Sequence, residues 1–215
     1  MAIPNDLLDG YRRFRAGRYS HEIERYLSLA GGQKPQTMII GCADSRVDPA
    51  TIFAAGPGEL FVVRNVAALV PPYEESQGFH GTSAAVEFAV DGLGIRNIVV
   101  MGHSFCGGVE AALAAAEHRP VGRFIRPWVE MLAERRDALL ADPNCPTDPR
   151  ELLHALESLA VLTSIANLKT FPFVRQAIAE RRLVIHGARF SIAAGELQWL
   201  DAETETFASI VEHAP

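Results

Sequence analysis

Cysteine is scarce in this chain, which has only Cys42, Cys106 and Cys145, and these stand far apart. Small secreted proteins held together by disulfides use more cysteines, in even numbers, behind a secretory leader. The first residues show neither the basic start nor the apolar core of such a leader. We therefore expect a cytoplasmic protein with reduced thiols, and any chemistry at these thiols should be catalytic or metal-binding.

Long apolar runs and excess basic charge are also missing. No uninterrupted apolar stretch approaches the roughly 20 residues of a membrane-spanning helix, so no membrane partner is expected. The 20 Lys and Arg residues against 26 Asp and Glu residues give a net charge of −6, which argues against a nucleic-acid partner. Neither Gly-x-x-x-x-Gly-Lys nor Gly-x-Gly-x-x-Gly occurs, so no nucleotide-binding module is indicated.

The composition that remains is that of a folded protein, with 48% hydrophobic and 21% charged residues among 215. Such a chain can bury a core without covalent staples. We expect one α/β domain over residues 1–215, with an N-terminal helical arm over about 1–32. Apolar residues recur at helical spacing between residues 20 and 30, and Gly31-Gly32 ends that helix.

Short apolar runs alternate with helical patterns along the rest of the chain. The expected strands are 38–40, 60–63, 97–101, 183–185 and 196–200. The expected helices are 82–93, 124–140 and a long one that follows an Asp148 N-cap and ends near Phe171. This order predicts an α/β fold with a central, mostly parallel sheet of four to five strands, flanked by helices, and a helical C-terminal half.

Two polar segments begin where two of the expected strands end, at residues 41–46 and 102–108. In an open parallel sheet, ligands bind beyond the carboxyl ends of the strands. If these two strands are neighbours, one crevice holds the side chains of Cys42, Asp44, His103 and Cys106. Two thiolates with an imidazole are a donor set that suits tetrahedral zinc.

Asp44 has two alternative roles in such a centre. Its carboxylate can close the site as a fourth ligand, which makes the metal structural. Alternatively, the guanidinium of Arg46 can hold the carboxylate in a bidentate pair and leave the fourth position to water. The sequence leaves both arrangements open.

Other features have plainer interpretations. Cys145 lies in a Pro-rich turn without a neighbouring ligand. The side chain of His186 follows an apolar run and is expected in the core. Solvent-facing positions are expected for His21, His118, His154 and His213. The segment Gly102-His103-Ser104-Phe105-Cys106 imitates the nucleophile elbow of serine hydrolases, but its last residue is not glycine.

The spacing Cys-x-Asp-x-Arg, followed about 60 residues later by His-x-x-Cys, resembles the zinc signature of β-class carbonic anhydrases. The resemblance continues in Gly-Gln-Lys-Pro at 32–35, in 44–47, in 58–67 and in Gly-Thr-Ser-Ala-Ala at 81–85. It covers most of the chain, to about Trp199.

This resemblance implies zinc held by Cys42, His103 and Cys106, with hydroxide or water in the fourth position and Asp44 there in a closed form. The implied activity is reversible hydration of carbon dioxide to bicarbonate and a proton by zinc-bound hydroxide, a lyase reaction. Asp44, paired to Arg46, would then orient the hydroxide.

The resemblance also implies substrate-binding roles for Gln33, Phe61, Val66 and Phe88. Gln33 would reach the substrate of a neighbouring subunit, in a homodimer or homotetramer with its active site at the subunit boundary. Phe88 stands where some members have tyrosine. Two alternatives remain, which are hydrolysis of carbonyl sulfide or carbon disulfide on the same zinc, and a binding protein with structural zinc.

Overall fold

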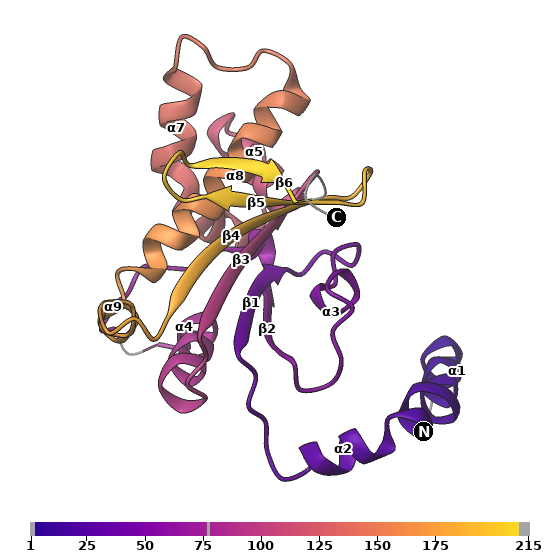
Figure 1. Ribbon diagram of the computed structural model, residues 1–215. Helices are drawn as coiled ribbons and strands as arrows, with labels where there is room; N and C mark the ends of the chain where they lie inside the picture. The colour runs from indigo at the N-terminus through magenta and orange to yellow at the C-terminus, as the bar shows by residue number, and fades with distance from the viewer. Residues whose placement is uncertain (1–2, 77, 211–215) are drawn as a thin grey trace.

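The computed structural model describes residues 3–76 and 78–210, and it is built around one twisted sheet (Figure 1). The strands are β1 (Thr37–Cys42), β2 (Leu60–Asn65), β3 (Asn97–His103), β4 (Val184–Ser191), β5 (Glu196–Asp201) and β6 (Thr206–Ser209). Their order is β2-β1-β3-β4-β5-β6. The first four lie parallel to one another, and β5 and β6 continue the sheet antiparallel. The predicted α/β class with a mostly parallel sheet is confirmed.

The sheet has six strands in the described part of the chain, one more than the upper end of the expected range. The additional strand is β6, the four residues Thr-Phe-Ala-Ser. Its single large apolar residue, Phe207, is too weak a pattern to indicate a strand. Pairing with β5 supplies the hydrogen bonds that make it one.

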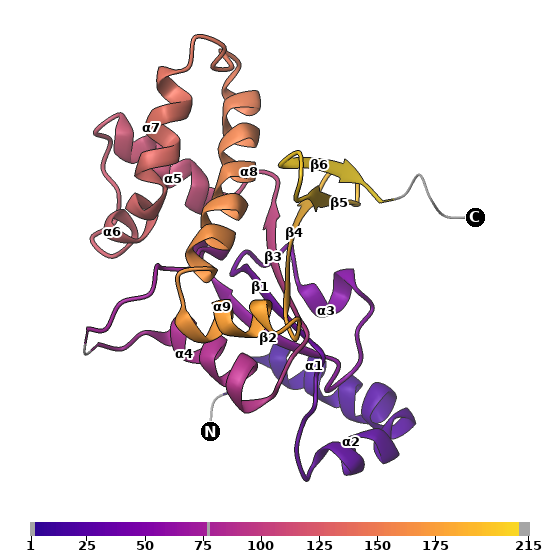
Figure 2. The same cartoon turned by 60° about the vertical axis from the view of Figure 1, so that its left-hand side comes forward.

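Most of the helices lie on one side of the sheet (Figures 1 and 2). The described α-helices are α1 (Asn5–Phe14), α2 (Ile23–Leu29), α3 (Pro49–Ile52), α4 (Gly81–Glu87), α5 (Gly107–Ala116), α6 (Ile125–Val129), α7 (Ala133–Ala141), α8 (Pro149–Leu168) and α9 (Pro172–Ala179). Shorter helical turns are η1 (Arg15–Tyr19), η2 (Val66–Ala68), η3 (Phe88–Gly92) and η4 (Glu130–Leu132). The expected helix 124–140 is therefore divided into α6, η4 and α7.

The long helix α8 packs against the central strands. Asp148 is its N-cap, as predicted, because the carboxylate accepts hydrogen bonds from the N–H groups of Arg150 and Glu151. Val161 and Ile165 of α8 join Ile98 and Val100 of β3 in one apolar core. Burial of such side chains contributes about 1.5–3 kcal/mol each and fixes α8 beside the carboxyl end of β3.

The N-terminal arm, of which residues 3–32 are described, stands away from the sheet in Figure 1. Neither α1 nor α2 has a buried residue. Arg18 and Arg25 tether the arm to the loop after α3 through the carbonyl of Ala55 and the carboxylate of Glu59. The apolar side of the arm therefore has no cover within the described part of this chain.

The described helices include none that is both long and apolar enough to cross a bilayer. The expected single domain of residues 1–215 remains a prediction, and it includes residues 1, 2, 77 and 211–215, which lie outside the described part.

Candidate metal centre and active site

The site forms where β1 and β3 end side by side. The two strands are parallel neighbours, so their last residues, Cys42 and His103, emerge at the same edge of the sheet. Three residues later Cys106 precedes the first residue of α5. The prediction that these side chains share one crevice is confirmed.

The three side chains form a compact, buried cluster. Their ligand atoms all lie within 4.8 Å of one another, and the two sulfur atoms are 3.9 Å apart. The exposed fractions of Cys42, His103 and Cys106 are 5%, 1% and 2%. Two sulfurs and one imidazole at this spacing suit a thiophilic divalent cation such as zinc.

The orientation of His103 provides an independent test of that fit. Its Nδ1–H donates to the carbonyl of Ser104 at 2.9 Å, which leaves Nε2 as the free ligand nitrogen. Nε2 is buried and has no hydrogen-bond partner among the described residues. A buried polar atom without a partner is costly, and a metal ion at this position removes that cost.

The two thiols influence each other's ionisation. Their shared hydrogen bond lowers the pKa of Cys42 to about 4 and, with burial, raises the pKa of Cys106. The first thiolate therefore forms readily, whereas the second proton is held strongly. A cation that binds both sulfurs takes the place of that proton.

Asp44 lies at the edge of the cluster, where Arg46 holds its carboxylate. The Nε and Nη2 atoms of Arg46 donate to the two carboxylate oxygens at 2.9 and 2.7 Å, and the backbone N–H of Arg46 adds a third bond at 2.9 Å. These bonds hold the pKa of the Asp44 carboxyl far below its usual range. The nearer oxygen is 4.0 Å from Nε2 of His103.

Arg64 holds the backbone of the same loop. From β2 it donates to the carbonyl of Cys42 at 2.8 Å and to that of Asp44 at 2.5 Å. Its Nη1 lies 3.4 Å from a carboxylate oxygen of Asp48. The ligand loop is thus fixed from the neighbouring strand.

The expected substrate-binding residues fall into two groups. Val66 directly follows Asn65, the register partner of Cys42, and a side chain on Gly108 would collide with it. Phe61 pairs in register with Met38, four residues before Cys42, and its ring lies 5.9 Å from that of Phe88.

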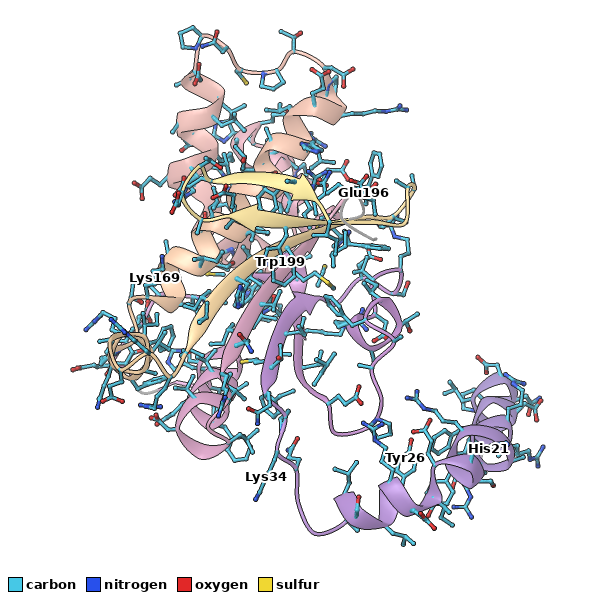
Figure 3. All side chains as sticks on the ribbon, viewed as in Figure 1. His21, Tyr26, Lys34, Lys169, Glu196 and Trp199 are labelled. Carbon is cyan, nitrogen blue, oxygen red and sulfur yellow. The ribbon has the colours of Figure 1, made fainter. Side chains whose placement is uncertain are left out.

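Gln33 lies farther still from the cluster of its own chain. It precedes the first residue of β1, and Lys34 beside it stands below the lower end of the sheet in Figure 3. Within one chain the structure therefore brings Val66 to the metal cluster, but not Gln33, Phe61 or Phe88.

Sequence reasoning missed two charged residues behind the cluster. Glu157 of α8 accepts a hydrogen bond from the N–H of Cys106 at 3.0 Å, and Arg189 of β4 lies 3.6 Å from its other oxygen. Each is only 3% exposed. Burial raises the pKa of the Glu157 carboxyl, while the Cys106 N–H and Arg189 oppose that shift. A lone acidic residue among the apolar positions of α8 is the signal that could have identified Glu157.

The solvent-facing prediction for His154 is confirmed, because the residue is exposed. Its Nε2 contacts Nη1 of Arg189, and burial lowers its pKa. Both residues line a cavity of about 620 Å³ whose rim includes Glu196, at the start of β5 in Figure 3. The cavity lies behind the turn that carries the metal ligands.

The remaining predictions on single residues hold where the structure describes them, except that His186 is not fully in the core. His21 and His118 are exposed, and Cys145 lies outside the metal cluster. His186 is half-buried, with Nε2 3.1 Å from Oδ1 of Asn97. His213 lies outside the described residues.

Comparison with known proteins agrees with this geometry. The carbonic anhydrase family model matches residues 37–197. A carbonic anhydrase of Pseudomonas aeruginosa is 37% identical over 97% of this chain and 92% of that protein. Beta carbonic anhydrase 3 of Arabidopsis thaliana is 32% identical over 92% of this chain and 76% of that protein.

The solved structures that resemble this chain are also β-carbonic anhydrases. The β-carbonic anhydrase CcaA superposes with a TM-score of 0.88 at 31% identity, covering 95% of this chain and 91% of that one. A tetrameric β-carbonic anhydrase of Sordaria macrospora gives a TM-score of 0.83 at 33% identity, covering 92% and 96%.

These relatives carry carbonic anhydrase names, so the sulfur-analogue hydrolase, serine hydrolase and structural-zinc alternatives gain no support. The likeness extends over nearly the whole chain and includes the strands that end at the Cys-His-Cys cluster. The chain therefore belongs to the β-class carbonic anhydrases.

Proposed function

We propose that this enzyme hydrates carbon dioxide reversibly to bicarbonate and a proton, with zinc held by Cys42, His103 and Cys106. The observation that carries the proposal is the free, buried Nε2 of His103 facing two sulfurs at metal-binding spacing. When bound, zinc supplies a Lewis acid that makes a hydroxide nucleophile from water near neutral pH.

Asp44 and Arg46 orient the nucleophile. A carboxylate held by Arg46 accepts a hydrogen bond from the attacking oxygen and turns a lone pair toward the carbon of the substrate. The low pKa of Asp44 keeps it an acceptor throughout the working pH range. This pairing favours the arrangement in which Asp44 stays off the metal rather than closing the site.

Val66 supplies an apolar wall beside the cluster, which suits a small apolar substrate. Gln33, Phe61 and Phe88 lie away from the cluster of their own chain, so we propose that they serve the site of a neighbouring subunit. The tetrameric relative supports a homo-oligomer. The exposed apolar side of the N-terminal arm supports contact with a second copy.

The test compares two cysteine substitutions. Cys42→Ser replaces one soft ligand with a hydroxyl and should lower the zinc content well below one ion per chain and abolish hydration. Cys145→Ser, in a half-buried turn outside the cluster, should leave both unchanged. Full zinc content in Cys42→Ser protein would overturn the ligand assignment.

A further inference from the structure

The turn that joins β3 to α5 connects two of the three metal ligands, His103 and Cys106, and has a strained conformation. Phe105, in its middle, has a φ of 56°, in the left-handed region that residues other than glycine rarely adopt. Such a conformation persists only when surrounding contacts hold it. Hydrogen bonds between Ser104 and the backbone of Phe190 and Ile192 hold the start of this turn. Two further contacts hold Phe105 and Cys106 from opposite sides.

One contact lies on the side of the metal cluster. The carbonyl of Phe105 accepts a hydrogen bond from Nη2 of Arg46 at 3.1 Å. The same Nη2 atom donates to Asp44 at 2.7 Å. The direction of the Phe105 carbonyl therefore helps to set the position of Arg46, and through it that of Asp44.

The opposing contact comes from behind the turn. The carboxylate of Glu157 accepts the N–H of Cys106 at 3.0 Å, and the N–H of Phe105 also contributes a hydrogen bond to it. Glu157 is fixed because α8 packs against β3, and its second oxygen faces Arg189 at 3.6 Å. Arg189 in turn contacts His154.

A buried carboxylate needs a countercharge, and Arg189, equally buried, supplies it. The pair thus places a fixed hydrogen-bond acceptor behind the strained turn. Neither residue is a metal ligand candidate in the cluster of Cys42, His103 and Cys106.

We propose that Glu157 is a positioning residue. It anchors the Phe105 turn from behind, so that the Phe105 carbonyl holds Arg46 and Arg46 holds Asp44 in its orienting position. Arg189 is the countercharge that keeps Glu157 in place. This inference rests on the proposed function, because it concerns the step that Asp44 assists.

The test uses two double variants that both remove the buried charges. Glu157→Gln with Arg189→Met keeps an acceptor oxygen for the Cys106 N–H, whereas Glu157→Met with Arg189→Met does not. The glutamine and methionine side chains have the same length, and neither variant leaves an unpaired buried charge. The comparison therefore isolates the acceptor.

Both variants should retain about one zinc per chain. The Glu157→Met double variant is expected to have a kcat lower by roughly tenfold or more than the Glu157→Gln double variant, with KM within about twofold, because a misplaced orienting group slows the chemical step. Crystal structures should show the Arg46–Phe105 hydrogen bond in the Glu157→Gln double variant and its loss in the Glu157→Met double variant. Equal kcat values with the bond present in both would overturn the proposal.

A second comparison separates positioning from general stability. In an Arg46→Lys background, the ammonium cannot hold both the carboxylate and the carbonyl, so the kcat difference between the two double variants should shrink to less than about twofold. A difference that persists undiminished would show that Glu157 does not act through Arg46. Zinc loss confined to the Glu157→Met double variant would show instead that Glu157 supports Cys106 as a ligand.

Two controls complete the design. Should the double variants fail to fold, Glu157→Asp serves in their place. It keeps the charge opposite Arg189 but moves the carboxylate away from the N–H of Cys106. Its kcat should fall as predicted for the Glu157→Met double variant, with zinc retained. Arg136→Gln removes another buried charge, remote from the turn, and should leave kcat unchanged. Wild-type protein with zinc but no hydration would refute the proposed function, while the crystallographic comparison would still decide the role of Glu157.

Discussion

Arg46 is the residue at which the two loops of the site meet. Its guanidinium binds the carboxylate of Asp44, from the loop after β1, and the carbonyl of Phe105, from the turn after β3. It is half exposed, so the pair reaches the solvent side of a cluster that is otherwise buried. A planar fork that serves two acceptors gives Asp44 one defined orientation.

Asp44→Asn tests that orientation. The amide lacks the charge that pairs with Arg46 and is a weaker acceptor, so kcat for hydration should fall roughly 10²-fold with the zinc content unchanged. Stopped-flow hydration measures the rate, and Asp91→Asn, at an exposed position, serves as the control. An unchanged rate in the Asp44→Asn protein would remove Asp44 from the mechanism.

His186 makes a prediction for stability. Burial lowers its pKa, so the folded protein prefers the neutral ring, which lies 5.4 Å from that of Trp199 (labelled in Figure 3). Unfolded histidine titrates near pH 6.5, so the stability from this group is present above about pH 6.5 and is lost as the pH falls toward the folded pKa.

His186→Gln should therefore flatten the decline in unfolding free energy between about pH 7 and pH 5. Denaturant titrations at several pH values measure that slope. Part of the decline should remain in the His186→Gln protein, because the pKa of His154 is also lowered. Identical slopes in both proteins would show that His186 protonates as easily in the folded state as in the unfolded one.

The metal ligands were predictable because each stands beside a clear strand end, and the topology of parallel strands brings such ends together. Glu157 and Arg189 were not, because their role depends on α8 and β4 packing behind the turn. A charge on an apolar face signals a partner, but the sequence does not say which partner.

At the scale of elements, consecutive apolar residues predicted strands correctly, whereas the strand without such a run was missed. β1 and β3 each contain an unbroken, buried apolar run, and both were predicted. β6 is four residues long and exists through its pairing with β5. Breaks within a helical pattern, as at η4, follow local backbone geometry that periodicity does not resolve.

The N-terminal arm is the element that most needs a partner. Leu7 and Tyr11 in α1, and Ile23 and Leu27 in α2, are spaced for one helix face and are 43–65% exposed. Exposed apolar stripes of this kind are usually covered by another molecule. A second copy of the chain is the natural cover in an enzyme with a tetrameric relative.

Leu27→Glu should weaken that association. A charge at the centre of a buried contact opposes assembly, so light scattering at fixed concentration should show a smaller mean mass. Glu24→Gln, on the same helix but already polar, should not change it. An unaltered mass in the Leu27→Glu protein would mean that the arm does not hold subunits together.

At the scale of the whole molecule, the residues proposed for the site lie toward two opposite ends of the sheet of one chain. The metal cluster and the Asp44–Arg46 pair lie at the carboxyl end of β1, whereas Gln33 precedes its other end. The six residues of β1 span roughly 17–20 Å, so Gln33 and the metal cluster of the same chain lie at least that far apart along the strand. We propose that a neighbouring subunit completes the site, with Phe61 and Phe88 as apolar walls and Gln33 as a polar group that contacts the substrate.

The most direct test of the central claim is stopped-flow hydration of carbon dioxide from about pH 6.5 to about pH 9, on protein whose zinc content has been quantified. We predict about one zinc per chain and a rate that rises with pH. Two thiolate ligands donate more charge than imidazoles would, so the pKa of zinc-bound water should lie above about 7. Fully zinc-loaded protein that shows no hydration at any pH in this range would contradict the account.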